Sequence, residues 1–114
     1  MKNICVILGT RPEIIKLYPI VENLKKKLNK KKFNLKTLYT NQHKEMGKEL
    51  SNLFKLRYDI MLNRDYKKNI SFDLIDQIHK ILKKNKIHYV VVMGDTLTGA
   101  AGSIAAYLNK SKIK

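Results

Sequence analysis

The sequence predicts an α/β protein with a doubly wound parallel sheet, a Rossmann-like arrangement in which helices cover both faces. Apolar segments of strand length alternate with segments of helix length along the chain, as right-handed β-α-β crossovers require. Polar clusters of Gly, Thr, Asn and Asp follow three of the strand-like segments. Because the carboxyl ends of parallel strands meet at one edge of the sheet, these clusters are expected to converge on a ligand site.

The first half of the chain is expected to form two strands and two helices. Residues 3–8 are a continuous apolar run, typical of a strand buried on both faces. A helix is expected over 12–29, because Pro12 suits a first helical turn and apolar residues recur there at helical spacing. A second strand is expected over 33–40, and a shorter helix with Met and Leu on one side over 44–54.

The second half is expected to continue the alternation. Residues 58–62 indicate a short third strand, and the polar stretch 63–69 indicates a loop. A helix is expected over 71–84, with an apolar face and acidic residues near its amino end. The Val-rich stretch 88–93 is the clearest buried strand, and the small residues of 98–108 predict a helix that packs closely against a sheet.

Length and composition indicate one domain or a piece of one. The chain has 114 residues, 44% of them hydrophobic, and residues 112–114 look like the start of a fifth strand. The sole cysteine, Cys5, lies in the first apolar run and is expected to be a buried core thiol without chemistry. No apolar stretch has the length of a membrane span or a signal region, so a cytoplasmic protein is expected.

The net charge of +15 raises the question of a nucleic-acid partner. Nearly all of the positive charge is lysine, since Arg11, Arg57 and Arg64 are the only arginines. The lysines gather on the polar faces and at the ends of the expected helices, where charged side chains are usually solvated. A nucleic-acid function is therefore not favoured.

The cluster after the first strand has the character of an anion site. Gly9 and Thr10 form a turn, and Arg11 and Lys16 lie in the first turns of the helix that follows. A helix amino terminus presents free N–H groups and a positive partial charge, so a diphosphate or nucleotide-sugar fits there. The alternative is an ordinary strand–helix turn with two solvated cations, in which Glu13 stabilises the helix start.

The clusters after the second and fourth strands add a histidine and an acid. His43 follows Asn41 and Gln42 and either donates hydrogen bonds at the site or has a structural role. Asp95 follows a fully apolar strand, where partial desolvation raises a carboxyl pKa and suits proton transfer. The alternative for Asp95 is an N-cap of the next helix. No spacing typical of metal ligands is present, and no cofactor is expected.

Taken in order, these residues resemble the N-terminal part of the non-hydrolysing UDP-N-acetylglucosamine 2-epimerases. The resemblance covers nearly the whole chain, with Asn41 where family members often have a small residue. It is carried by Gly9-Thr10-Arg11-Pro12-Glu13, Ile15-Lys16, Pro19, Thr40-Asn41-Gln42-His43, Glu45-Met46 and Gly94-Asp95-Thr96.

The resemblance implies an isomerase that interconverts UDP-N-acetylglucosamine and UDP-N-acetylmannosamine for cell-surface polysaccharide biosynthesis. UDP is eliminated across C1–C2 to leave a glycal, and re-addition inverts C2. It also implies a GT-B-type pair of Rossmann-like domains with the site between them, and a homodimer at full length. Residues 1–114 would be the N-terminal domain, ending before its last strands and without the second, UDP-binding domain, and so with little or no activity alone.

The resemblance also implies roles for individual residues. Asp95 would be the catalytic acid, and Arg11 and Lys16 would bind the nucleotide-sugar near its phosphates. His43 would lie near the cleft, with a role that the family pattern leaves open. The substrate-binding set is then Gly9, Thr10, Arg11, Lys16 and His43.

Three other interpretations fit the same sequence. A glycosyltransferase half-domain shares the two-domain architecture and would transfer a sugar to an acceptor. A small basic binding module would bind nucleic acid or an acidic partner with an affinity that falls steeply with salt. A structural remnant without function would self-associate through uncovered apolar faces.

Overall fold

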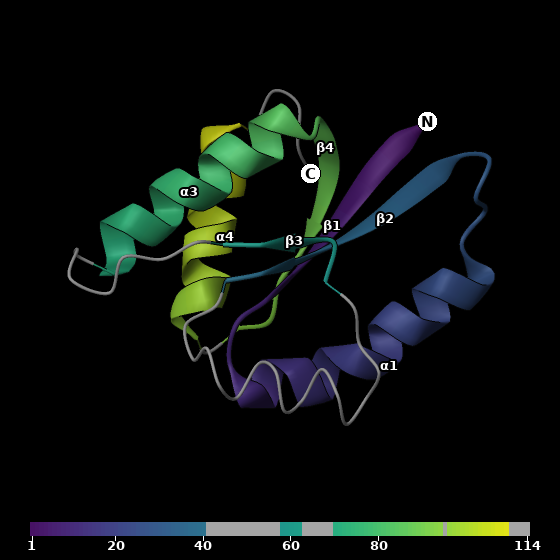
Figure 1. Ribbon diagram of the computed structural model, residues 1–114, viewed down its shortest axis with the longest axis horizontal. Coiled ribbons are helices and arrows are strands. Elements are labelled where there is room, and N and C mark those ends of the chain that lie inside the picture. The colour runs from purple at the N-terminus through teal and green to yellow at the C-terminus, as the bar shows by residue number, and fades with distance from the viewer. Residues whose placement is uncertain (41–57, 63–69, 95, 110–114) are drawn as a thin grey trace.

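The computed structural model describes residues 1–40, 58–62, 70–94 and 96–109. Within them, a parallel four-stranded sheet has the order β3-β2-β1-β4. Figure 1 shows α1 on one face of the sheet and α3 and α4 on the other, which confirms the doubly wound fold. The elements are β1 (Lys2–Leu8), α1 (Arg11–Lys27), β2 (Phe33–Tyr39), β3 (Ile60–Met61), α3 (Ile70–Lys84), β4 (Ile87–Val91) and α4 (Leu97–Leu108).

Two separate cores explain the uninterrupted apolar run of β1. Cys5 and Ile7 point into the core shared with α3 and α4, whereas Val6 and Leu8 point into the core shared with α1. All four side chains are fully buried. Since alternate residues of a strand face opposite sides, only a strand covered on both faces requires apolar residues at every position.

The expected elements are confirmed where the structure describes them, with shifted ends. The expectation that 88–93 is the clearest buried strand is wrong: only Ile87 of β4 is buried and the others are half-buried, because β4 lies at the edge of the described sheet. β4 begins at Ile87 rather than 88 and ends at Val91, and its pairing with β1 shifts register between Asn3 and Ile4. At that irregularity His88 Nδ1 accepts a hydrogen bond from the Asn3 backbone N–H at 2.9 Å. The expected helix 44–54, loop 63–69 and fifth strand from 112 lie outside the described residues.

α4 packs closely against the sheet through its small residues, as its sequence predicts. An added Cβ at Gly102 would stand 2.8 Å from Val92 Cγ1 and 3.0 Å from Ile7 Cδ1. Ala101 and Ala105 are buried in the core that α3, α4 and the sheet share. A side chain larger than alanine at Gly102 would push the helix off the sheet.

The β2–β3 edge is held by a polar clamp and an aromatic pair. Asp59 Oδ2 accepts hydrogen bonds from the backbone N–H of Thr37 at 2.7 Å and from its hydroxyl at 3.1 Å. The rings of Tyr39 and Tyr58 stack with centroids 4.6 Å apart and an interplanar angle of 15°. These contacts explain how a strand of only two residues holds its place. Among the described helices, none combines the length and apolar character needed to cross a membrane.

Candidate functional site

The strand order places the crevice of the fold at the carboxyl ends of β1 and β4. From β1 the chain passes to β2 on one side, and it later reaches β4 on the other side of β1. Ligands of doubly wound sheets bind where the strand order reverses in this way. The turn that starts at Gly9 and the turn that starts at Gly94 therefore stand on neighbouring strands, as the sequence predicts.

The turn after β1 is organised by Glu13. Thr10 is the N-cap residue of α1, and Glu13 Oε1 accepts hydrogen bonds from its backbone N–H and its hydroxyl, both at 2.9 Å. The Glu13 side chain is only 1% exposed, and its Oε2 has no hydrogen-bond partner. This confirms the expectation that Glu13 stabilises the helix start.

The same bonds limit what the helix start can donate to an anion. Both donors of Thr10 are engaged by Glu13, Pro12 has no N–H, and the Ile14 N–H bonds to the Thr10 carbonyl at 3.0 Å. Few backbone donors of the first turn are left for a ligand. An anion bound here would therefore depend mainly on cationic side chains.

The two predicted cations both belong to α1. Arg11 is its first residue, and the Arg11 side chain lies outside the described part of the structure. The Lys16 side chain is exposed to solvent. Five residues along a helix correspond to a rotation of about 140°, so Lys16 and Arg11 do not project side by side. They could meet one extended ligand only from two directions.

A buried pair of threonines lies behind the turn and was not singled out from the sequence as site residues. Thr40, directly after β2, and Thr98, in α4, are both fully buried, and their hydroxyl oxygens are 3.1 Å apart. Gly9 lies against them, because a Cβ there would overlap Thr98 Oγ1 and stand 2.8 Å from Thr40 Oγ1. The hydrogen bond joins residues 58 positions apart, so no local pattern could reveal it.

The turn after β4 is capped by a threonine. The Thr96 hydroxyl accepts a hydrogen bond from the Gly99 N–H at 3.0 Å, which makes Thr96 the N-cap of α4. Because Thr96 occupies the N-cap position, the alternative interpretation of Asp95 as the N-cap is not supported. Asp95 itself lies outside the described residues. An open cavity of about 650 Å³ borders this turn, lined in part by Met93, Thr96 and Ser103.

The structure describes two of the three histidines of the chain. His43 and its neighbour Gln42 lie outside the described residues, so their placement at the site stays a prediction. His88 sits at the amino end of β4, and His79 Nδ1 is 2.7 Å from Asn109 Nδ2. Both histidines have structural hydrogen bonds, in keeping with their omission from the predicted site.

Cys5 is excluded as a nucleophile by its surroundings. It is fully buried, and burial, reinforced by the charge of Asp59 and partly opposed by Lys36, raises the pKa of its thiol to about 12. Since the thiolate is the reactive form of cysteine, Cys5 is unreactive near neutral pH. This agrees with the expectation that it is a core residue.

Comparisons with known proteins agree on one family. Residues 26–114 match the family model described as UDP-N-acetylglucosamine 2-epimerase. The UDP-N-acetylglucosamine 2-epimerase of Methanococcus maripaludis is 40% identical over 111 residues, which cover 93% of this chain and 29% of that protein. The corresponding enzyme of Campylobacter jejuni is 32% identical over 117 residues, covering 99% of this chain and 30% of that protein.

Solved structures agree with the sequence relatives. The structure of S. aureus MnaA with UDP superposes with a TM-score of 0.85 at 33% identity, covering 99% of this chain and 30% of that one. The UDP-GlcNAc 2-epimerase from Neisseria meningitidis bound to UDP-GlcNAc superposes with a TM-score of 0.82 at 33% identity, covering 99% and 31%. The chain thus spans about 30% of the length of the relatives it matches.

Proposed function

The chain belongs to the UDP-N-acetylglucosamine 2-epimerase family, and we propose from this that it supplies the amino-terminal side of a UDP-sugar site. The reaction is the interconversion of UDP-N-acetylglucosamine and UDP-N-acetylmannosamine. The observation that carries the proposal is the convergence of the turns after β1 and β4 at the reversal of strand order. Related structures contain UDP and UDP-GlcNAc, which supports a nucleotide-sugar as the ligand.

The proposed chemistry is elimination followed by re-addition. A base removes the proton from C2 of the sugar, the C1–O bond to UDP breaks, and a glycal with a C1–C2 double bond remains. UDP then adds back to C1 while a proton reaches C2 on the opposite face. Asp95, four residues after the end of β4, serves as an acid–base group in this proposal.

The binding roles follow from charge and position. Arg11 and Lys16 neutralise the diphosphate, Arg11 with a planar donor set suited to phosphate oxygens. Gly9 allows the close approach of Thr98, and Thr10 begins the helix. His43, in the cluster after β2, is proposed to border the same crevice as a hydrogen-bonding group.

The proposal for the whole enzyme extends beyond these residues. A second domain grips the UDP, and the full-length protein is a cytoplasmic homodimer that needs no metal or cofactor. The chain by itself then binds UDP weakly and turns over little or no substrate. The glycosyltransferase alternative has no comparable support, because the family match is to epimerases.

Titration of the isotope-labelled chain with UDP, followed by amide NMR, tests the proposal. The amides of Gly9, Thr10, Gly94 and Thr96 are expected to shift, and Lys16→Gln is expected to weaken binding about threefold to tenfold. Lys80→Gln serves as a control, since Lys80 lies on α3 and pairs with Asp76 at 2.9 Å. Shifts elsewhere, or none at all, would contradict the site.

An assay of UDP-N-acetylglucosamine turnover by the same sample tests whether this chain holds only one side of the active site. Proton exchange at C2 and appearance of the manno epimer are expected to be at background. Turnover at the rate of a complete enzyme would contradict the proposal that this chain holds one side of the site only.

A further inference from the structure

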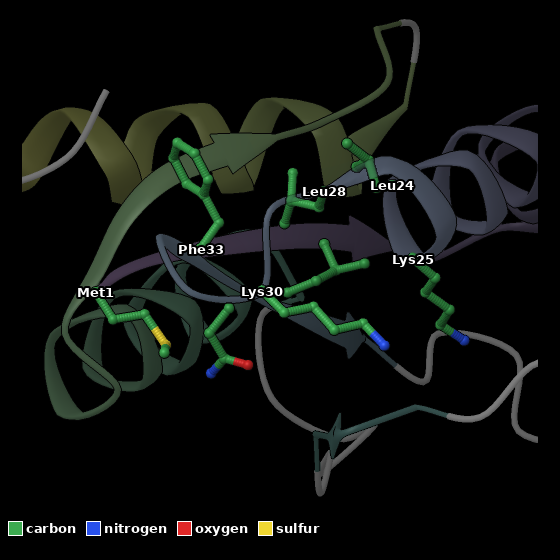
Figure 2. Close-up of a pocket in the computed structure, with 8 residues that line it drawn as sticks. Met1, Leu24, Lys25, Leu28, Lys30 and Phe33 are labelled. Carbon is green, nitrogen blue, oxygen red and sulfur yellow. The ribbon is translucent and has the colours of Figure 1, made fainter.

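A groove lies at the amino edge of the sheet, at the opposite ends of the strands from the proposed UDP-sugar site. It has a volume of about 410 Å³ and lies between the last turns of α1 and the start of β2 (Figure 2). Its walls are mainly apolar, formed by Leu24, Leu28, Phe33 and Leu35, with the exposed Met1 at one end. A groove of this size and lining is typical of sites that accept an apolar group.

The rim of the groove is basic. Lys25 and Lys30 belong to its lining, and in Figure 2 both side chains extend on the same side of it. Lys25 has a loose ion pair with Glu22 at 3.8 Å, whereas Lys30 pairs with no carboxylate of the described residues. Four more exposed lysines are neighbours of these two in the sequence, at Lys26, Lys27, Lys31 and Lys32.

We propose that this groove binds an acidic polypeptide segment that places an apolar side chain between the lysines. Charge complementarity selects the acidic partner, because the amino edge carries many cations and few acids among the described residues. The concave apolar floor favours a partner with an apolar side chain that can enter the groove. This site goes beyond the proposed epimerase function and does not depend on it.

Other occupants fit the groove less well. A membrane surface takes up protruding apolar side chains and gains little from a hollow. Double-stranded nucleic acid binds mainly through its phosphates and keeps its bases stacked within the duplex, so an apolar floor adds little to its affinity. A second copy of this chain would bring the same lysines, and a net charge of +15, against one another.

The probe for the test is a fluorescein-labelled peptide that alternates glutamate and leucine, titrated against the whole chain by fluorescence anisotropy. A matched peptide with serine in place of leucine keeps the charge and removes the apolar anchor. It is expected to bind about tenfold more weakly, because each buried leucine contributes substantially to affinity. This comparison leaves the protein unchanged, so altered folding cannot explain the difference.

Two single variants with equal net charge locate the site. Lys30→Gln is expected to weaken binding of the leucine peptide about threefold. Lys80→Gln, on α3 and not among the lysines of the amino edge, is expected to leave binding unchanged within error. Equal losses in the two variants, or equal affinity for the two peptides, would overturn the proposal by showing general attraction to a basic chain.

Competition distinguishes the other classes of partner. Vesicles of phosphatidylcholine with phosphatidylglycerol, and a double-stranded oligonucleotide, are added to the peptide complex at matched charge. If the groove is specific for a polypeptide, replacing Leu28 by asparagine should not change the binding of the vesicles or of the oligonucleotide. Tighter binding of either competitor than of the peptide, lost in Leu28→Asn, would overturn the assignment to a polypeptide.

Discussion

Glu13 is the residue on which the geometry of the turn after β1 most depends. One carboxylate oxygen accepts both donors of Thr10 at 2.9 Å, and the side chain is 1% exposed. The turn that would present Arg11 to a phosphate is thus held by an anion that is itself shielded from water.

Replacing Glu13 separates the role of its acceptor from that of its charge. Glu13→Ala leaves both Thr10 donors without their partner and opens a cavity, and it is expected to cost about 2 kcal/mol of unfolding free energy. Glu13→Gln keeps one carbonyl oxygen as acceptor and is expected to cost about 1 kcal/mol or less. Urea unfolding measures both. Equal losses would show that the charge, rather than the acceptor geometry, holds the turn.

Cys5 predicts how stability depends on alkaline pH. Its thiol pKa is raised from 9.0 to about 12 in the folded state, so the folded chain keeps this proton after the unfolded chain has lost it. The contribution is fully present below pH 9 and is lost as the pH rises towards about 12. The free energy of unfolding should fall by about 1.4 kcal/mol per pH unit from this group.

The Cys5→Ala variant isolates that contribution. It loses some packing at every pH, but its stability should fall less steeply between about pH 9 and about pH 11 than that of the parent chain. Burial and the nearby Tyr39 also raise the pKa of Tyr58 to about 12, an effect in the same direction that is common to both proteins. Parallel pH profiles from urea unfolding would contradict the prediction.

At the scale of elements, the packing of α4 against the sheet depends on glycines that differ in the space available for a Cβ atom. A Cβ at Gly99 would overlap the Met93 carbonyl oxygen, a backbone atom that cannot move away, and a Cβ at Gly9 would overlap Thr98. A Cβ at Gly102 would meet only the ends of the Val92 and Ile7 side chains. At Gly94 nothing lies within 4 Å.

Alanine substitutions at these glycines are expected to rank accordingly. Gly94→Ala should be neutral within about 0.5 kcal/mol. Gly102→Ala should cost about 1 kcal/mol or less, since better helix propensity offsets the crowding. Gly9→Ala and Gly99→Ala should each cost about 2–3 kcal/mol. Chemical denaturation checks the order, and a loss at Gly94 as large as that at Gly99 would contradict this account of the packing.

The order of the elements could be predicted from the sequence, because burial on one or two faces gives each segment a characteristic pattern of apolar residues. The ends of β4 could not, since they depend on pairing between Asn3 and His88, 85 positions apart. At the site, the meeting of the turns after β1 and β4 follows from topology alone. The engagement of the Thr10 donors by Glu13 and the contact of Thr40 with Thr98 depend on side-chain packing that no spacing records.

At the scale of the whole molecule, the two edges of the sheet differ in chemistry. The carboxyl edge carries the turns proposed to bind UDP-sugar, and the amino edge carries most lysines of the described part of the chain at Lys2, Lys25, Lys26, Lys27, Lys30, Lys31, Lys32, Lys83, Lys84 and Lys86. Binding at one edge therefore leaves the other open.

The charge of the amino edge predicts a response to salt. Raising sodium chloride from about 0.05 M to about 0.5 M shortens the screening length several-fold and weakens repulsion among the lysines. The melting temperature is expected to rise by about 2–5 °C, as measured by circular dichroism. The double variant Lys26→Gln with Lys31→Gln should show a smaller rise in melting temperature than the unchanged chain. An identical rise would show that the repulsion does not come from these lysines.

The stacked rings of Tyr39 and Tyr58 give this protein an optical signal of its own. The chain contains no tryptophan and six tyrosines, so its near-ultraviolet circular dichroism comes largely from tyrosine, and most strongly from rings held 4.6 Å apart. Detachment of β3 would separate that pair while the helices stayed intact. The near-ultraviolet band would then report the edge of the sheet separately from the far-ultraviolet signal of the helices.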